Sequence, residues 1–239
     1  MDKKAYIRNE FSKIQIELSD EQAEQFEQYY EMLITKNEVM NLTAITEFEE
    51  VVQKHFIDSI MIKEVREPGD GEKWIDVGTG AGFPGIPLKI VYPQIRMTLL
   101  DSLNKRVKFL QEVVDALELA DVEALHGRAE EYAKKAEYRE QYDCCVSRAV
   151  ANLASLAEYC LPFVKTGGKL IALKGPKTAE ELKNAETAIK RLGGRLAGVY
   201  ESKIPYTDLE HTVVIIEKIG KTPAEYPRKA GTPSKKPIK

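Results

Sequence analysis

The run Trp74–Gly85, with the sequence WIDVGTGAGFPG, constrains the fold of this chain more than any other segment. An apolar stretch typical of a strand leads into Asp76, and a loop with glycines at positions 78, 80, 82 and 85 precedes an apolar, helix-like stretch. Such a loop lets a nucleotide-like ligand lie against bare backbone at the start of a helix. Pro84 suits the first helical turn, where the N–H that proline lacks would have no partner. We predict a site for a nucleotide-containing cofactor, and a purely structural turn is the alternative.

From Lys73 onward, short apolar stretches alternate with helical ones such as Lys105–Leu117 and Leu153–Phe163. This alternation is typical of a doubly wound, mostly parallel sheet, so we predict an α/β fold with seven strands. The last two strands have no clear helix between them, and we expect them to pair as antiparallel neighbours at the sheet edge. The predicted strands are Trp74–Val77, Met97–Asp101, Val122–His126, Tyr142–Ser147, Lys169–Leu173, Leu196–Tyr200 and Thr212–Glu217.

Residues 1–67 are predicted to form an N-terminal helical extension. Ser19 and Gln22 have the spacing of a capping box, and Thr46 resembles a second capped helix start. The turn cluster Pro68–Gly71 would separate this extension from residues 68–217, the predicted cofactor-binding domain. The helix that starts near Thr46 would carry an apolar stripe of Val51, Val52, His55, Ile57 and Ile60.

Composition narrows the class of protein. A chain of 239 residues, 43% of them apolar, can hold one large α/β domain with an appendage. It has no stretch as long as a membrane span and no apolar signal region near Met1, so we expect a cytoplasmic protein. We also expect a monomer. Cys144, Cys145 and Cys160 do not resemble a disulfide framework, and we expect them to be buried thiols. The histidines at positions 55, 126 and 211 are too scattered for a zinc cluster, so we expect no metal.

Residues 218–239 form a basic C-terminal tail rich in Pro, Lys and Gly. Seven cations and one acid give this tail a charge of +6, which leaves about −9 on residues 1–217 of a chain whose net charge is −3. We predict a phosphate-binding arm, with a solvated terminus as the alternative. Its removal would then weaken RNA binding and leave cofactor affinity nearly unchanged. The cations proposed to contact RNA are Arg228, Lys229, Lys235 and Lys236.

Asp76 bears on which cofactor the loop binds. Residues 80–85 fit G-x-G-x-x-G literally, which keeps a dinucleotide, and with it an NAD-dependent oxidoreductase, as an alternative. A carboxylate just before Gly78 would repel a pyrophosphate. The sulfonium and α-amino group of S-adenosylmethionine would instead attract it, so we favour that cofactor.

Acidic residues follow the next two strands as well. Asp101 lies about 20 residues beyond the glycine loop, where an acid binds ribose hydroxyls. It could also cap the helix that follows. After the third strand, Glu130 or the backbone of Ala129 could read the adenine edge, and capping of the next helix is the alternative role for Glu130.

Longer motifs are similar to those of a known family. The continuation of the loop through Ile86 and Pro87 resembles the glycine loop of the ribosomal RNA small-subunit methyltransferase G family, also called RsmG or GidB. The other similar motifs span nearly the whole chain: Asn41–Ile45, His55–Ser59, Ser147–Ala149, Leu173–Gly175 and Tyr226–Pro237.

This resemblance implies a class I, Rossmann-like methyltransferase that uses S-adenosylmethionine. The product that it implies is N7-methylguanine in 16S ribosomal RNA, free or within the small subunit or an assembly intermediate. The cofactor contacts that it implies are Gly78, Phe83, Ala129, Glu130 and Arg148. The residues themselves add Asp76, Gly80, Gly82 and Asp101 to that set.

Guanine N7 carries an exposed lone pair, so methyl transfer needs no general base and depends on alignment. Arg148 could bond guanine O6, a phosphate or the methionine carboxylate, and Lys174 could contact a phosphate or a base. Either could instead pair with a nearby acid. We expect His55 and Asp58 to fix the N-terminal helices onto the sheet. A non-catalytic RNA-binding or assembly factor with the same fold is the remaining alternative.

Overall fold

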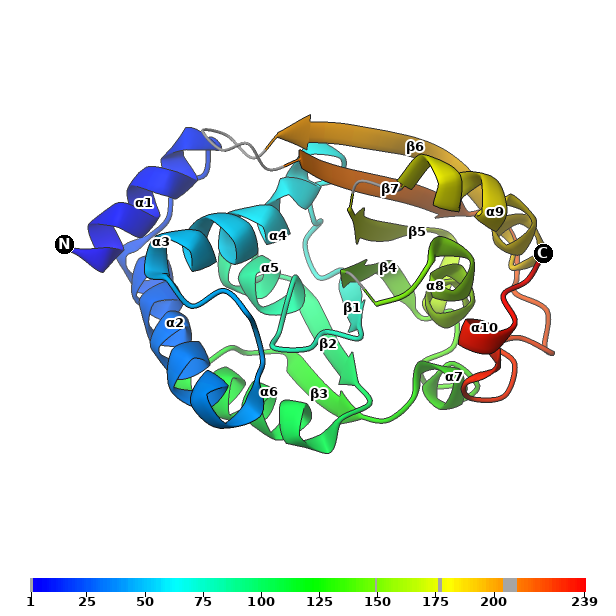
Figure 1. Cartoon of the computed structure of the whole chain (residues 1–239), viewed down its shortest axis with the longest axis horizontal. Helices are drawn as coiled ribbons and strands as arrows, with labels where there is room; N and C mark the ends of the chain where they lie inside the picture. The colour runs from blue at the N-terminus through cyan, green and yellow to red at the C-terminus, as the bar shows by residue number, and fades with distance from the viewer. Residues whose placement is uncertain (1, 149, 176–177, 204–209) are drawn as a thin grey trace.

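The computed structural model describes residues 2–148, 150–175, 178–203 and 210–239, with the backbone alone at positions 179, 202, 210 and 211. Ala149 of the Ser147–Ala149 motif and the His211 side chain therefore lie outside the described residues. One sheet runs through the molecule in the order β3-β2-β1-β4-β5-β7-β6 (Figure 1). Its strands are β1 Lys73–Val77, β2 Arg96–Asp101, β3 Val122–His126, β4 Tyr142–Arg148, β5 Val164–Lys174, β6 Gly194–Lys203 and β7 Glu210–Lys218.

The pairing of the strands confirms the predicted topology. Strands β1 to β5 pair in parallel, and β7 runs antiparallel to both β5 and β6. The last two strands are thus antiparallel neighbours, with β6 at the sheet edge, as expected. The doubly wound, seven-stranded sheet places the carboxyl ends of β1, β2 and β4 side by side, where an open α/β sheet binds its ligands.

Side chains alternate between two cores along each central strand. In β1, Trp74 packs into one core while Ile75 and Val77 pack into the other. In β4, the neighbours Cys144 and Cys145 likewise face opposite cores, and both are buried, as is Cys160. This period of two is the pleat of a strand that is covered on both faces.

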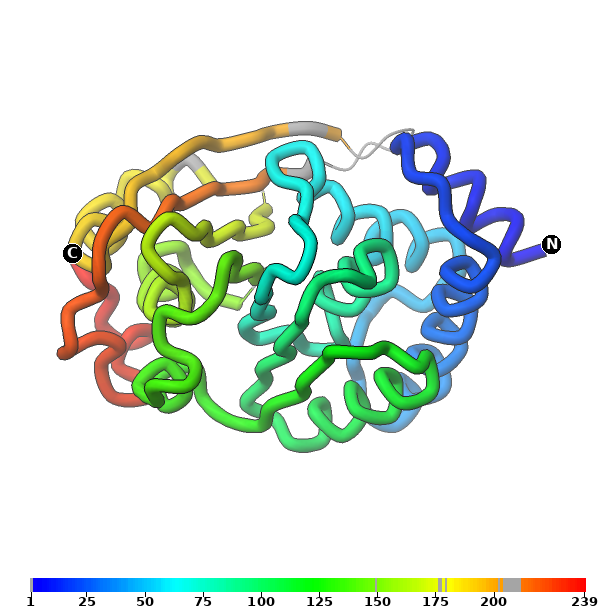
Figure 2. Tube along the Cα trace, turned by 180° about the vertical axis from the view of Figure 1, so that it is seen from behind, coloured from blue at the N-terminus to red at the C-terminus, as the bar shows by residue number. Residues whose placement is uncertain are grey.

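Helices cover both faces of the sheet, and the two termini lie at opposite ends of the molecule (Figures 1 and 2). The first core includes side chains of the N-terminal helices and of α5 and α6, and the second includes those of α8, α9 and the tail. No helix in the described part of the chain is long and apolar enough to cross a membrane. The helices are α1 Lys3–Lys13, α2 Asp20–Met40, α3 Phe48–Val51, α4 Asp58–Ile60, α5 Gly85–Val91, α6 Asn104–Ala116, α7 Ala129–Tyr132, α8 Leu153–Cys160, α9 Thr178–Arg191 and α10 Thr232–Lys235, with 3-10 turns at Met61–Glu64 and Leu161–Phe163.

The predicted capping box at Ser19 and Gln22 is present at the start of α2. Two other predicted helix starts were correct only in part. The start at Thr46 was placed one residue early, because Glu47 is the N-cap of α3 and makes no side-chain cap. Similarly, Pro84 immediately precedes α5 instead of lying in its first turn. Between α3 and α4, Val52–Ile57 form a π-helix, which the apolar stripe did not predict.

The N-terminal helices share the first core with the sheet and contact the glycine loop directly. The buried Tyr29 hydroxyl on α2 donates to the Ala81 carbonyl at 2.7 Å. Burial holds the pKa of this phenol well above its usual value, so it remains a donor. The Tyr29 ring also lies 5.5 Å from that of Phe83. The extension therefore supports the loop and does not form a separate core.

We expect Tyr29→Phe to lower the free energy of unfolding by about 1–3 kcal/mol, because it leaves the buried Ala81 carbonyl without its donor. Tyr30→Phe is the matched control: its hydroxyl bonds the Thr46 carbonyl at an exposed position, so its loss should cost about 0.5 kcal/mol or less. Urea unfolding of both variants measures the difference. An equal loss of unfolding free energy in both variants would contradict a stabilising role for the Tyr29 hydrogen bond.

Candidate functional site

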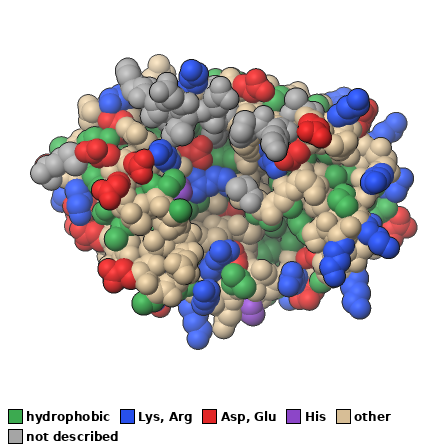
Figure 3. Space-filling view, in the orientation of Figure 1, with side chains coloured by type: hydrophobic (Ala, Val, Ile, Leu, Met, Phe, Trp, Pro, Cys, Tyr) green, Lys and Arg blue, Asp and Glu red, His purple; other side chains and the backbone are tan. Residues whose placement is uncertain are grey.

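A groove lies over the carboxyl ends of β1, β2 and β4, and Gly78 divides it into two halves. One half has a volume of about 470 Å³ and includes Thr79–Ala81, Asp101 and Arg148 in its lining. The other, of about 200 Å³, lies between Gly78 and Gly127–Glu130. Both halves share Gly78, Ser102 and Val150. The face in Figure 3 is hollowed near its middle, with Lys and Arg side chains in and below the hollow.

The glycine loop presents bare backbone to this groove. Gly80 has a φ of +64°, and a Cβ added there would meet no atom within 4 Å. Gly82, by contrast, has a φ of +110°, and a Cβ there would lie 2.6 Å from the Tyr29 hydroxyl. Gly80 thus leaves space for a ligand, whereas Gly82 leaves space for α2.

Asp76 holds the loop from beneath. Its Oδ2 accepts from the Thr79 hydroxyl at 2.6 Å and from the Gly85 N–H at 2.8 Å, which caps α5. Its other oxygen, Oδ1, is buried without a hydrogen-bond partner among the described residues. Burial raises the pKa of this carboxyl to about 7. A cationic ligand near Asp76 would favour its charged form, which agrees with a sulfonium or ammonium group.

Asp101 joins two loops at the rim. Its Oδ2 accepts from the Gly80 N–H and its Oδ1 from the Leu103 N–H, both at 2.9 Å. The second bond orders the turn before α6, but the N-cap of this helix is Leu103 and it has no side-chain cap, so the alternative capping role of Asp101 was wrong. Arg106 approaches the same carboxylate at 3.5 Å. Asp101 lines the groove, so a ribose contact and the structural role are compatible.

Arg148 ends β4 and is held by the N-terminal helices. Its Nη1 pairs with Asp58 Oδ2 at 2.8 Å, and its guanidinium carbon lies 4.8 Å from the centre of the Phe83 ring. Its Nη2 lies 3.3 Å from His55 Nδ1. The side chain is 17% exposed and lines the larger half of the groove. His55 and Asp58, expected to join the extension to the sheet, do so through Arg148.

His55 is neutral at physiological pH in this surrounding. Burial, reinforced by the Arg148 charge, lowers the pKa of the imidazole to about 4. Its Nε2 lies 2.8 Å from the Thr43 hydroxyl, and its ring stacks on Phe83 at 4.6 Å. Thr43 and His55 both line the groove, so the motifs Asn41–Ile45 and His55–Ser59 meet there.

Glu130 and Ala129 line the smaller half of the groove at the start of α7. The Glu130 side chain is buried, and its Oε1 accepts from the Gly231 N–H at 2.9 Å. Ser234 of the tail lines the same half. The C-terminal tail therefore reaches the groove.

Lys174 is committed to protein partners. Its Nζ donates to the Ala151 carbonyl at 2.8 Å and pairs with Glu181 at 2.7 Å, and the side chain is 7% exposed. Lys174 thus pairs with a nearby acid, which was the alternative to an RNA contact. An RNA contact would require Lys174 to leave Glu181. The residue instead fixes the loop between β4 and α8, beside the groove.

Arg228 has a similar commitment within the tail. It forks onto the carboxylate of Glu158, with Nη2 at 2.6 Å and Nε at 2.9 Å. Lys229, Lys235 and Lys236 are exposed. Tyr226 and Ile238 are buried in the second core, so the tail is not the solvated terminus that was one of its two readings.

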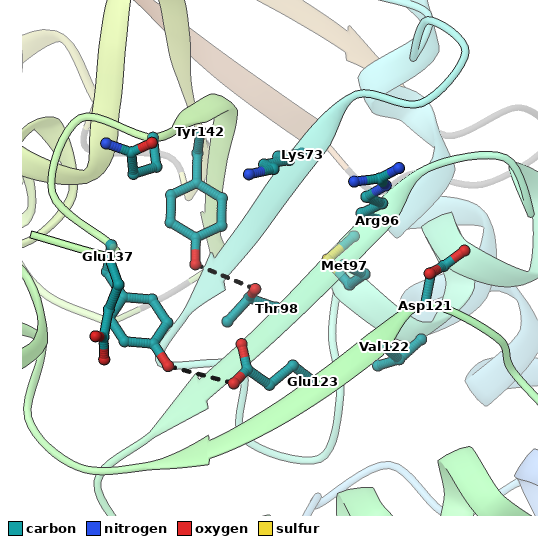
Figure 4. A pocket seen from close by; sticks show the side chains of 11 residues that line it. Lys73, Arg96, Met97, Thr98, Asp121, Val122, Glu123, Glu137 and Tyr142 are labelled. Atoms are coloured by element: carbon teal, nitrogen blue, oxygen red, sulfur yellow. Dashed lines mark hydrogen bonds between the residues drawn. The ribbon is translucent and has the colours of Figure 1, made fainter.

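Another pocket, of about 360 Å³, lies at the amino ends of β1 to β4 (Figure 4). Tyr142 and Thr98 hydrogen-bond within it at 3.2 Å, as do Tyr138 and Glu123. None of the predicted site residues lines it, and ligands of open α/β sheets bind at the opposite edge. No group of three or more His, Cys, Asp or Glu among the described residues could hold a metal ion.

Several residues of the groove escaped prediction from the sequence. Leu42, Thr43 and Arg106 line the larger half, and Tyr159 and Ser234 line the smaller one. Thr43 and Ser234 lie in motifs that the sequence singled out, yet nothing local places them at the glycine loop. Their position depends on contacts between distant segments.

The sheet order and its flanking helices give this chain the fold of class I methyltransferases. An S-adenosylmethionine-dependent methyltransferase from Aquifex aeolicus has the same fold, with a TM-score of 0.52 and 19% identity, over 71% of this chain and 93% of that one. The family model GidB, described as rRNA small subunit methyltransferase G, matches residues 22–208.

Curated relatives agree with that match. Ribosomal RNA small subunit methyltransferase G of Alkaliphilus metalliredigens is 51% identical over 239 residues, all of both chains. The protein of that name from Lachnoclostridium phytofermentans is 53% identical over 93% of this chain and 92% of its own. This chain belongs to the rRNA small subunit methyltransferase G family, as its motifs suggested.

S-adenosylmethionine is therefore the cofactor, and the dinucleotide alternative is excluded. The groove fits it: the loop leaves open space over Gly80, the buried Asp76 suits a nearby cation, and the two halves offer room for a nucleoside and an amino-acid arm.

We expect Gly80→Ala to lower the affinity for S-adenosylhomocysteine at least tenfold, because the added methyl enters the groove. Gly71→Ala is the matched control, since Gly71 has a φ of +67° and equally open surroundings away from the groove. Both variants should lose about 1–2 kcal/mol of stability to backbone strain. Calorimetric titration measures the affinities, and an unchanged value for Gly80→Ala would contradict the placement.

Proposed function

We propose that this protein transfers the methyl group of S-adenosylmethionine to N7 of a guanine in 16S ribosomal RNA. The observation that carries this proposal is the groove itself, where an open cofactor loop meets Arg148 at the end of β4. The name of the curated relatives supports a small-subunit RNA as substrate. The intact loop disfavours a non-catalytic binding protein.

The reaction needs alignment and no proton acceptor. The N7 lone pair attacks the methyl carbon as the bond from that carbon to sulfur breaks, so the sulfonium becomes a neutral thioether and the guanine becomes cationic. The two titratable acceptors in the larger half, His55 and Asp101, are already engaged in hydrogen bonds. This arrangement suits a substrate that needs no deprotonation.

Arg148 would hold an oxygen at the reacting end of the groove. Asp58 and the Phe83 ring restrain its guanidinium, and Nη1 and Nη2 already contact Asp58 and His55. Guanine O6, an RNA phosphate or the methionine carboxylate would therefore share this guanidinium with those partners. For the cofactor we propose contacts with the predicted residues that line the groove, which are Gly78, Gly80, Phe83, Asp101, Ala129, Glu130 and Arg148. Asp76 would act through its charge from beneath the loop, whereas Gly82 faces α2.

Incubation of the protein with labelled S-adenosylmethionine and small-subunit RNA or particles tests this function. We expect a single N7-methylguanine, mapped by cleavage at the modified base, and at least a hundredfold slower transfer by Arg148→Lys, which keeps the charge but loses the fork. A parallel loss of S-adenosylhomocysteine affinity would assign Arg148 to the cofactor, and unchanged affinity would assign it to RNA. Methylation at another atom, or full activity of Arg148→Lys, would contradict the proposal.

We also infer that the protein is a monomer, which sedimentation tests, and that it acts in the cytoplasm, which cell fractionation tests.

The exposed lysines of the tail would contact RNA as well. Replacing Lys229, Lys235 and Lys236 with Gln should reduce the slope of log affinity against log salt by about 2, if each lysine neutralises one phosphate. Lys3→Gln with Lys4→Gln, at the opposite end of the molecule, is the control and should leave the slope unchanged. Equal slopes for the tail variant and the unmodified protein would exclude contact between these lysines and RNA phosphates.

A further inference from the structure

The C-terminal tail reaches the smaller half of the groove, where the cofactor adenine is proposed to lie. Ser234 lines that half together with Gly127–Glu130 and Tyr159 of α8. Tyr159 and Ser234 line this half together, so the tail meets α8 at this point, and the Ser234 hydroxyl donates to the Gly231 carbonyl at 3.2 Å. A segment more than 100 residues away in sequence thus completes the wall opposite Ala129.

The segment that carries Ser234 is anchored on both sides of the wall. Before it, Arg228 forks onto Glu158, a carboxylate with no exposed surface. After it, Ile238 is buried in the second core. A buried carboxylate left without its partner is costly, so the Arg228–Glu158 pair opposes release of the tail.

Two further bonds fix the backbone of the wall. The Gly231 N–H donates to Glu130 Oε1 at 2.9 Å, and the Ser155 hydroxyl donates to the Pro233 carbonyl at 2.8 Å. Glu130 therefore belongs to the groove and to the tail anchor at once. Displacement of the tail would free this carboxylate and open the groove on one side.

We propose that residues 231–234 are a cofactor-positioning element, which holds the adenosine end of S-adenosylmethionine from the side opposite α7. This inference rests on the proposed placement of the cofactor. It replaces the expectation that loss of the tail leaves cofactor affinity unchanged. The tail lysines that we propose for RNA lie on this same segment, so the two ligands share one structural element.

The test measures S-adenosylhomocysteine binding by calorimetry, without RNA, on the full-length protein and three variants. A chain that ends at Arg228 keeps the pair with Glu158 but lacks the wall. Ser234→Phe adds a ring to the wall, which would occupy the smaller half of the groove. Ala224→Phe is the control, since Ala224 is also an exposed tail residue but does not line the groove. Thermal unfolding without ligand establishes that each variant is folded.

We expect the truncation and Ser234→Phe each to weaken binding at least tenfold, and Ala224→Phe to stay within twofold of the unmodified protein. Affinities within twofold for both the truncation and Ser234→Phe would overturn the inference. If the truncated chain does not fold, Ser234→Phe decides alone. Absence of binding by the unmodified protein would instead contradict the proposed cofactor site, so the two failures are distinguishable.

Discussion

Two carboxylates at the ends of neighbouring strands hold the glycine loop, and the functional groove depends on them. Asp76 binds Thr79 and the first N–H of α5, while Asp101 binds Gly80 and Leu103. The loop has left-handed residues at Gly78, Gly80 and Gly82. Backbone carbonyls accept from most of its N–H groups, and the two carboxylates accept from those of Gly80 and Gly85. They leave the loop rigid and its outer surface bare, which is what a cofactor lying against backbone requires.

Both ends of the chain complete this site. The N-terminal helices support the loop through Tyr29 and reach the groove through His55 and Asp58, which hold Arg148. The tail reaches it from the other end through Gly231 and Ser234. The divisions at residues 67 and 217 therefore mark changes in sequence pattern, whereas each core spans one of those divisions.

Local patterns predicted the fold well because its elements carry their own signals. Alternating apolar strands, the glycine loop and the Ser19 capping box all appear where they were expected. The π-helix and the partners of Arg148, Lys174 and Arg228 could not be predicted in the same way. Arg228 meets Glu158 from 70 positions away, and Tyr29 meets Ala81 from 52. An isolated arginine in a basic tail carries no sign of which acid it will meet, so the tail read as a phosphate-binding arm or a solvated end.

The groove on both sides of Gly78 is the centre of this account, and a crystal structure with S-adenosylhomocysteine tests it most directly. The account predicts adenine between Ala129 and Ser234, ribose beside Asp101, and the amino-acid arm along Gly78 and Gly80 toward Arg148. A ligand bound in the pocket at the amino ends of the strands, or with adenine beside Arg148, would contradict it.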